Sequence, residues 1–443
     1  RITGYRGKPM SITRGINSMK IPEAFTILRF AHAFASGGGV ETYLEDLDRE
    51  LLRRNPWTII RFYLTGRKDE KEPIREEVGR GILIRAPLYA ERKVIPGEND
   101  PRESVARWKR VSEDFVRDYI IYHPLLYRLF FHKLIRKRPI PAREIEAIGA
   151  RRAVSAIMRE HRIDLLVMHY VGGRDSAEII AEAVERNVPY VAVNHFSNDR
   201  LNHLSFREQT RKASGIGGVT NVGIPRWLHS RFFNLFDGID TNIFKTESAR
   251  PVLFQDDAPI ALLPARITPA KGQKDLIQIC ASLHKEGIGI KAALAGRADS
   301  PEYIQMLKNL ARESGIEKDV LFLGELSPMQ VRDWYAAAKV LAFPTYHHEG
   351  LPRVLLEAQA MKLPPISYVS GGTPGAIAHG KTGYLVTKGD LSGFTAKLRE
   401  LITNEKKRIE MGHAGRSVVT ERFSLPALAS RHEDFYLRAS LSY

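Results

Sequence analysis

The stretch PIALLPARITPAKGQKDLIQICASLHKEGIGIKAALAG, residues 259–296, decides the fold class of this chain. Apolar runs at 259–266 and 290–296 have the length and aliphatic composition of buried β-strands. Between them, residues 274–287 have the pattern of a helix. A strand, a helix and a second strand in this order form the crossover unit of a parallel sheet. The stretch therefore predicts an α/β protein.

The same alternation of aliphatic runs and helical patterns continues along the chain. The clearest helix is predicted at residues 40–54, where apolar side chains recur on one helical face. The expected strands are 24–34, 58–64, 81–86, 164–170 and 189–195 in the first half, and 259–266, 290–296, 319–325, 340–346 and 363–369 in the second. We therefore expect two Rossmann-like α/β domains, with ligands bound at the carboxyl ends of their strands in a cleft between them.

The 443 residues exceed one typical hydrophobic core and suggest two domains. A boundary near residues 245–256 divides a first domain, 1–245, from a second, 246–422. Charge and proline interrupt the alternation near 87–150, which we interpret as an insertion in the first domain. The helical tail at 423–443 is expected to cross back onto the first domain.

The composition is that of a globular protein, with 43% hydrophobic and 27% charged residues. The single cysteine, Cys280, lies in an apolar run and cannot form a disulfide framework, which favours a reducing compartment. No apolar run reaches the roughly 18 residues that a membrane span needs. We therefore expect a cytoplasmic protein, with Cys280 as a core residue.

A net charge of +16 calls for an anionic partner. Residues 119–138, YIIYHPLLYRLFFHKLIRKR, interleave aromatic and aliphatic residues with basic ones, the composition of a segment that lies in a lipid interface. This favours an anionic membrane surface, at the inner face of the membrane, over nucleic acid as the partner. A buried helical hairpin with a basic outer face is an equally open interpretation of the segment.

Two glutamates eight positions apart, Glu349 and Glu357, frame the helical pattern in EGLPRVLLEAQAM. Pro352 suits the first turn of a helix, since its missing N–H is not needed there. The helix start, with Gly350 and Leu351, offers N–H groups to an anion, while the two carboxylates can accept hydrogen bonds from hydroxyls. Phosphate beside a polyol describes a nucleotide sugar. An ordinary amphipathic helix with a capping acid is the alternative.

Four further motifs follow expected strands. Arg266 and Lys271 lie in one loop and could neutralise a diphosphate, although an exposed pair of cations has the same pattern. His195, at a strand end, could hydrogen-bond a sugar or phosphate, transfer a proton, or be structural. SGGGVE, residues 36–41, and SGGTPG, residues 370–375, could bring backbone close to a ligand or form plain turns. No histidine has defensible metal-ligand spacing, so we predict no metal site.

In order and spacing, six segments resemble the retaining nucleotide-sugar glycosyltransferases of the GT-B fold, of the family 4 type. The resemblance is strongest over residues 235–390, and the first domain matches only through SGGGVE and His195. The segments are FDGIDTNIF, PARITPAKG, VLFLGELS, EGLPRVLLEAQAM, SGGTPG and GKTGYLV.

The resemblance implies a role for each matching residue. Arg266 and Lys271 would clamp the diphosphate, Glu357 would bind the ribose hydroxyls and Glu349 the transferred sugar. His195 would lie near that sugar. The SGGGVE loop, with Gly37, Gly38 and Gly39, would close over the donor, and the backbone around Gly296, Leu323 and Leu326 would flank the base. The chain departs from the family pattern at Asp237, Pro352, Lys362 and Gly375.

The implied activity is transfer of a hexosyl group from a UDP- or GDP-linked sugar to an acceptor hydroxyl with retention of configuration. The resemblance implies no metal and no cofactor, because the cations replace a divalent ion. We expect a glycan or lipid-linked acceptor, as in polysaccharide or glycolipid biosynthesis. A nucleotide-sugar epimerase or hydrolase of the same fold, an inactive transferase and a basic nucleic-acid-binding protein are the alternatives.

Overall fold

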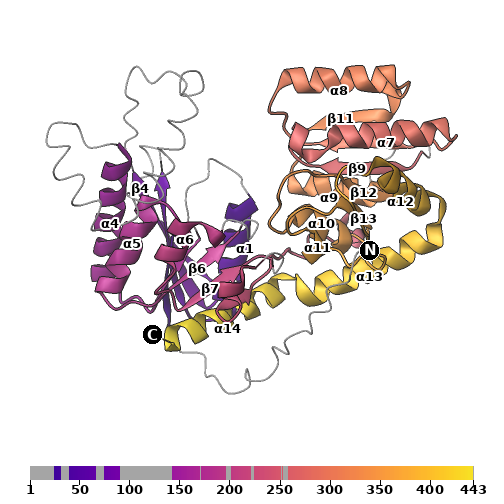
Figure 1. The fold of residues 1–443 in the computed structure, drawn as a ribbon. Helices are drawn as coiled ribbons and strands as arrows, with labels where there is room; N and C mark the ends of the chain where they lie inside the picture. Colours follow the sequence, from indigo (N-terminus) through magenta and orange to yellow (C-terminus); the bar gives the residue numbers. More distant parts are fainter. Residues whose placement is uncertain are drawn as a thin grey trace.

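The protein consists of two α/β domains, each built on a parallel sheet, and two C-terminal helices run beneath both (Figure 1). This arrangement comes from a computed structural model. The structure describes residues 24–30, 39–65, 74–89, 142–169, 171–195, 201–220, 224–250, 252 and 258–442.

The first domain has an eight-stranded sheet in the order β3-β4-β2-β1-β5-β6-β7-β8, parallel except where β3 pairs with β4. Its strands are β1 Thr26–Phe30, β2 Thr58–Thr65, β3 Ile74–Val78, β4 Gly81–Tyr89, β5 Leu165–Met168, β6 Tyr190–Asn194, β7 Gly215–Gly218 and β8 Phe232–Asn234. Its helices are α1 Gly39–Arg54, α4 Ala142–Glu160, α5 Arg174–Glu185 and α6 Leu204–Gln209, with a 3₁₀ turn at Arg226–Leu228.

The second domain has a six-stranded parallel sheet in the order β11-β10-β9-β12-β13-β14. Its strands are β9 Ile260–Pro264, β10 Lys291–Ala295, β11 Val320–Gly324, β12 Val340–Phe343, β13 Pro365–Tyr368 and β14 Tyr384–Val386. Its helices are α7 Gln273–Lys285, α8 Pro301–Glu313, α9 Pro328–Ala337, α10 Arg353–Ala360, α11 Thr373–Ala376, α12 Leu391–Thr403 and α13 Glu405–Arg422. Short 3₁₀ turns lie at Thr246–Ser248, Pro269–Lys271 and Glu317–Asp319.

Each expected strand corresponds to a strand of the structure, but β3, β7, β8 and β14 were not predicted. The sequence of β7, GIGG, lacks the β-branched and aromatic residues that mark a strand. Its glycines are required by packing: a Cβ on Gly215 would lie 2.7 Å from the Phe435 ring, and one on Gly217 would lie 2.3 Å from Leu235. The side chains that pack onto β7 therefore come from elsewhere in the chain.

Both faces of each sheet are covered by helices, so the central strands are buried, as the parallel topology requires. Cys280 of α7 is fully buried in the core of the second domain. Burial raises the pKa of its thiol to about 12, so the residue packs as a small apolar group.

The C-terminal helix α14, Leu425–Leu441, lies on the first domain although it follows the second in sequence (Figure 1). It contacts α1, β5, β6 and β7, and it buries Phe435 and Tyr436 against them. The two domains are thus joined twice, once by the chain after β8 and once by this helix.

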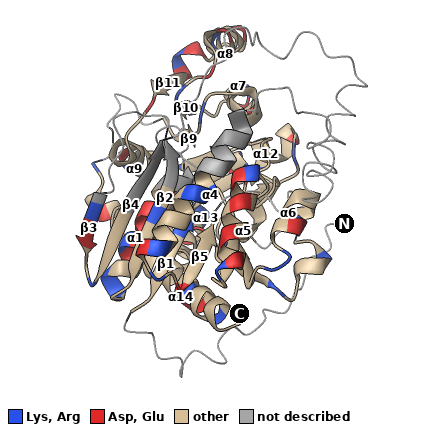
Figure 2. Cartoon of the chain, turned by 90° about the vertical axis from the view of Figure 1, so that its left-hand side faces the viewer, with Lys and Arg blue, Asp and Glu red and all other residues tan. Residues whose placement is uncertain are grey.

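Several predictions from the sequence lie outside the described residues: Gly37, Gly38, the aromatic and basic segment 119–138 and most of the insertion near 87–150. Acidic and basic residues lie side by side on α1 and on α5 of the first domain (Figure 2). Arg151 of α4, for example, contacts Glu178, Glu182 and Glu185 of α5. Within the described part of the chain, no helix is long and apolar enough to span a membrane.

Candidate active site

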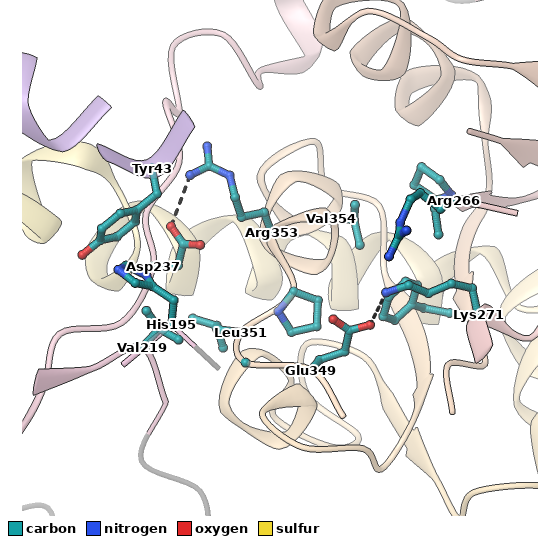
Figure 3. Close-up of a pocket in the computed structure, with 15 residues that line it drawn as sticks. Tyr43, His195, Val219, Asp237, Arg266, Lys271, Glu349, Leu351, Arg353 and Val354 are labelled. Atoms are coloured by element: carbon teal, nitrogen blue, oxygen red, sulfur yellow. Dashed lines mark hydrogen bonds and ion pairs between the residues drawn. The ribbon is translucent and has the colours of Figure 1, made fainter. Parts of the chain in front are cut away.

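A cavity of about 450 Å³ lies between the two domains, where strands of both sheets end (Figure 3). The first domain contributes residues just after β6 and from α1, and the second contributes the segments that follow β9 and β12. Its lining comprises Tyr43, His195, Val219, Asp237, Pro264, Ala265, Arg266, Lys271, Phe343, Glu349, Gly350, Leu351, Pro352, Arg353 and Val354. Residues more than 300 positions apart in the sequence therefore line the same cavity.

Lys271 and Glu349 form an ion pair in the cavity, with 2.5 Å between Lys271 Nζ and Glu349 Oε1. Both side chains are largely buried, and Thr345 Oγ1 donates a second hydrogen bond to the same carboxylate oxygen at 3.2 Å. Gly272, with φ 77°, turns the chain directly after Lys271, and a Cβ there would lie 2.0 Å from the Pro344 oxygen. The close packing of these two strand-end segments brings the lysine and the glutamate together.

Arg266 lines the same cavity from the loop after β9, beside Lys271 (Figure 3). Its side chain is 59% exposed and lies 3.4 Å from Asp299. An exposed arginine with one weak partner can turn toward an anion at little cost. The structure thus places both predicted cations of the clamp at one cavity.

The turn Glu349–Gly350 is closely packed, and there is no room for a Cβ at Gly350 or at Gly372 beside it. A Cβ on Gly350 would lie 2.4 Å from the His195 oxygen, and one on Gly372 would lie 1.4 Å from the Gly350 oxygen. Gly372 N also donates a hydrogen bond to the Glu349 oxygen at 2.9 Å. The double glycine of SGGTPG therefore supports the turn from behind, and neither glycine is among the residues that line the cavity.

Helix α10 begins at Arg353, and Pro352 occupies the cap position with φ −65° and ψ 114°. The sequence pattern placed Pro352 in the first turn of the helix, whereas in the structure it lies just before that turn. Leu351, Pro352 and Val354 line the cavity, so the helix start faces it. This end of the helix carries unpaired N–H groups that suit an anion.

Glu357 lies one turn further along α10 and does not line the cavity. Tyr335 Oη donates a hydrogen bond to Glu357 Oε2 at 3.0 Å, and burial raises the pKa of the glutamate. Gly296 N donates to the Gly324 oxygen, and a Cβ on Gly296 would lie 2.2 Å from the Ala265 oxygen. Leu323 and Leu326 pack against the core. The ribose-binding and base-flanking roles of these residues remain predictions.

Arg353 is a cavity residue that sequence reasoning missed. Its guanidinium lies 3.1 Å from Asp46 Oδ2 of the first domain, 3.2 Å from Asp237 Oδ1 and 3.9 Å from Glu357 Oε1. The pair with Asp46 joins α1 to α10 across the domain boundary. Burial raises the pKa of Asp237 to about 6 despite the nearby arginine. The sequence singled out Asp237 only as a departure from the family pattern, and it carried no signal for these distant pairings.

His195 lines the cavity from the first domain, directly after β6. Its Nε2 lies 2.7 Å from Nδ1 of His169, which follows β5. The Tyr43 ring meets the His195 ring edge-on at 4.8 Å. Burial, and then the charge of Arg29, lower the pKa of His195 to about 3. The His195 imidazole is therefore neutral at pH 7. Its neighbours Tyr43 and His169 were not singled out as site residues by the sequence pattern.

Gly39 is the first residue of α1. Among the described ranges, no group of three or more histidine, cysteine, aspartate or glutamate side chains could hold a metal ion.

Comparison with protein families identifies one matching region. Residues 244–418 match the family "Glycosyl transferases group 1". This region contains Arg266, Lys271, Glu349 and Glu357, whereas His195 lies outside it.

Curated relatives match about half of the chain. A GDP-mannose-dependent alpha-(1-6)-phosphatidylinositol monomannoside mannosyltransferase of Mycobacterium tuberculosis is 29% identical over 243 residues, which cover 50% of this chain and 62% of that protein. A D-inositol 3-phosphate glycosyltransferase of Corynebacterium aurimucosum is 31% identical over 215 residues, 46% of this chain and 50% of that protein. The chain thus covers less than two thirds of these relatives.

Solved structures match over nearly the whole chain. A glycosyltransferase from Rickettsia africae superposes with a TM-score of 0.66 at 15% identity, covering 94% of this chain and 98% of that one. Anabaena HepE in complex with UDP superposes with a TM-score of 0.63 at 16% identity, covering 93% and 99%. This chain therefore has the two-domain GT-B fold of solved glycosyltransferases, and its residues 244–418 match the group 1 glycosyl transferases.

Proposed function

We propose that this protein is a retaining glycosyltransferase that moves a hexosyl group from a UDP- or GDP-linked sugar to an acceptor hydroxyl. The observation that carries the proposal is the convergence of Arg266, Lys271, Glu349 and His195 on one cavity between the domains. The match of residues 244–418 to group 1 glycosyl transferases supports it. One relative is named as dependent on GDP-mannose, and one structural neighbour holds UDP.

In this proposal the Lys271–Glu349 pair exchanges partners when the donor binds. The diphosphate takes Lys271 and Arg266 as counter-charges, and the start of α10 adds N–H groups. Glu349, which Lys271 no longer neutralises, accepts hydrogen bonds from hydroxyls of the transferred sugar. The clamp thereby stabilises charge that grows on the leaving diphosphate, the largest electrostatic demand of the reaction. With two cations and a helix end in place, the proposal requires no metal.

The proposed transfer needs no nucleophile from the protein. The bond between the anomeric carbon and the diphosphate oxygen breaks, and the acceptor oxygen bonds to that carbon on the same face. The acceptor proton passes to a diphosphate oxygen. Closure of the domains on the donor would exclude water and limit hydrolysis.

For the acceptor we propose a lipid-linked glycan, glycolipid or polysaccharide precursor at the cytoplasmic membrane surface. The net charge of +16 and the composition of residues 119–138 support an anionic surface. One relative is named as a phosphatidylinositol monomannoside mannosyltransferase. Co-sedimentation with vesicles that contain anionic lipid, but not with neutral vesicles, is expected; equal binding to both would contradict this location.

A thermal-shift panel of UDP-, GDP- and ADP-sugars, recorded with EDTA present, tests the donor site. We expect one nucleotide class to stabilise the wild type, and Arg266→Ala and Lys271→Ala to weaken its binding by roughly ten- to a hundredfold, since each loses a charge-assisted hydrogen bond. Product formed from the donor without any acceptor would instead identify an epimerase or hydrolase.

Two control variants separate this effect from general loss of charge. Arg312→Ala removes an arginine that is 61% exposed and paired with Glu317, close to the 59% of Arg266 but outside the cavity. Lys291→Ala removes a lysine that is 10% exposed and paired with Asp319, comparable with the 15% of Lys271. Both controls should bind the donor as the wild type does.

A further inference from the structure

Two buried groups, Arg29 and His169, connect the core of the first domain to His195 at the cavity wall. Arg29, on β1, is fully buried, and its Nη1 lies 2.5 Å from Nε2 of His169. His169 Nδ1 in turn lies 2.7 Å from Nε2 of His195, which lines the cavity. Asp48 holds the guanidinium in place, with 2.9 Å between Arg29 Nη2 and Asp48 Oδ1.

The chemistry of the groups fixes the direction of each hydrogen bond between Arg29, His169 and His195. A guanidinium can only donate, so Nε2 of His169 accepts from Arg29. A neutral imidazole carries one N–H, which in His169 must then be on Nδ1. That N–H donates to Nε2 of His195, so the single proton of the His195 ring is on Nδ1.

Both imidazoles are neutral at pH 7, as this direction requires. Burial, and then the positive charge of Arg29, lower the pKa of His169 well below its usual value. The same two causes lower the pKa of His195 to about 3. A second proton on either ring would place a cation beside the buried guanidinium.

The ring of His195 is also held in orientation. Tyr43 packs edge-on against it, at an interplanar angle of 74°. His432 of α14 fixes Tyr43 in turn: its Nδ1 donates to the Leu428 oxygen at 2.9 Å, so its Nε2 accepts from Tyr43 Oη at 2.6 Å. Arg29 Nη1 also donates to Tyr436 Oη of the same helix at 3.1 Å. The C-terminal helix thus supports the cavity wall of the first domain.

We propose that Arg29, acting through His169, holds His195 as the Nδ1–H tautomer and so presents a hydrogen-bond donor, not a proton acceptor, to the bound ligand. Arg29 and His169 are positioning residues. The identity of the ligand, an oxygen of the transferred sugar or of its phosphate, rests on the proposed function. A donor at this place stabilises an oxygen that gains negative charge, and it leaves the acceptor proton to the diphosphate.

The test is the tautomeric state of His195 in the ligand-free protein. Long-range ¹⁵N–¹H correlation spectra of protein labelled with ¹⁵N-histidine distinguish a protonated from an unprotonated ring nitrogen, and the signals of His195 are those lost in His195→Gln. At pH 7 we expect a protonated Nδ1 and an unprotonated Nε2. The Nε2–H tautomer, or an imidazolium, would overturn the proposal. Because no ligand is present, this result is independent of whether the proposed function holds.

Two substitutions at His169 test the role of the relay. His169→Phe keeps a ring but removes both nitrogens, so His195 should lose its Nδ1–H preference, and binding of UDP-glucose or GDP-mannose should weaken roughly tenfold. His169→Gln can accept from Arg29 with its oxygen and donate to His195 with its nitrogen, so it should restore both the tautomer and the affinity. A His195 that keeps Nδ1–H in the phenylalanine variant would show that the relay does not set it.

Discussion

Lys271 and Glu349 neutralise one another in the cavity, and under the proposed function they separate so that the lysine binds the phosphate and the glutamate binds the sugar. The sequence predicted both residues, because each lies in a motif that follows a strand. It could not predict that they pair, nor that Arg353 and His169 belong to the site. Those contacts join positions tens to hundreds of residues apart, and only the folded chain brings them together, within one domain for His169 and across the two domains for Arg353 and Asp46.

At this scale, Glu349→Gln should separate nucleotide binding from transfer. The amide no longer competes for Lys271, so UDP or GDP, offered without a sugar, should bind roughly three- to tenfold more tightly. Transfer should fall, because the sugar loses a charged hydrogen-bond acceptor. Calorimetry with the nucleoside diphosphate measures the first effect. Glu433→Gln, which removes another buried, ion-paired carboxylate outside the cavity, is the control. Weaker nucleotide binding by Glu349→Gln would argue against the exchange of partners.

The sequence predicted strands correctly where aliphatic runs are continuous. It missed a strand where the side chains that pack on it come from distant parts of the chain. The ten expected strands are present because each is an apolar run between turn or helix patterns. The strand β7 escaped prediction because its glycines make room for Leu235 and Phe435. For SGGTPG the sequence left a ligand contact and a plain turn both open, and in the structure its glycines pack behind the Glu349–Gly350 turn.

The close packing of Gly372 against the Glu349–Gly350 turn gives a second prediction. In Gly372→Ala the new Cβ would lie 1.4 Å from the Gly350 oxygen, so the turn must move. We expect a loss of roughly 2–4 kcal/mol in the free energy of unfolding, measured by urea denaturation, together with weaker donor binding. Gly289→Ala, where nothing lies within 4 Å of the new Cβ, should change neither. If the two variants behave alike, the turn does not depend on the close contact.

For the whole molecule, the buried cluster of Arg353, Asp46, Asp237 and Glu357 ties α1 of the first domain to α10 of the second. The paired domains could be argued from sequence, since they follow from repeated strand and helix patterns, and the helical tail at 423–443 was expected to cross back onto the first domain. The charge cluster could not, because an aspartate in a turn and an arginine after a proline look like surface residues. The helix α14 lies on the first domain and reaches the cavity wall through His432.

This cluster predicts how stability depends on pH. Burial raises the pKa of Asp237 from 3.8 to about 6, so the folded state binds the proton more tightly than the unfolded chain does. The titration of Asp237 therefore lowers the stability of the wild type by roughly 2–3 kcal/mol as the pH rises from about 4 to about 6. Asp237→Asn removes this titration. It should be close to neutral at pH 4 and stabilising by roughly 2 kcal/mol at pH 8, as measured by urea denaturation. A variant less stable than the wild type at pH 8 would mean that the pair with Arg353 outweighs burial.

Calorimetric titration of the stabilising nucleotide sugar into the wild type, Arg266→Ala and Arg312→Ala, with EDTA present, tests the proposed donor site most directly. Arg266 and Arg312 are almost equally exposed, and only Arg266 lines the cavity. We expect the wild type and Arg312→Ala to bind alike and Arg266→Ala to bind roughly ten- to a hundredfold more weakly. Equal affinity in all three proteins, or no binding by the wild type, would contradict a nucleotide-sugar site in this cavity.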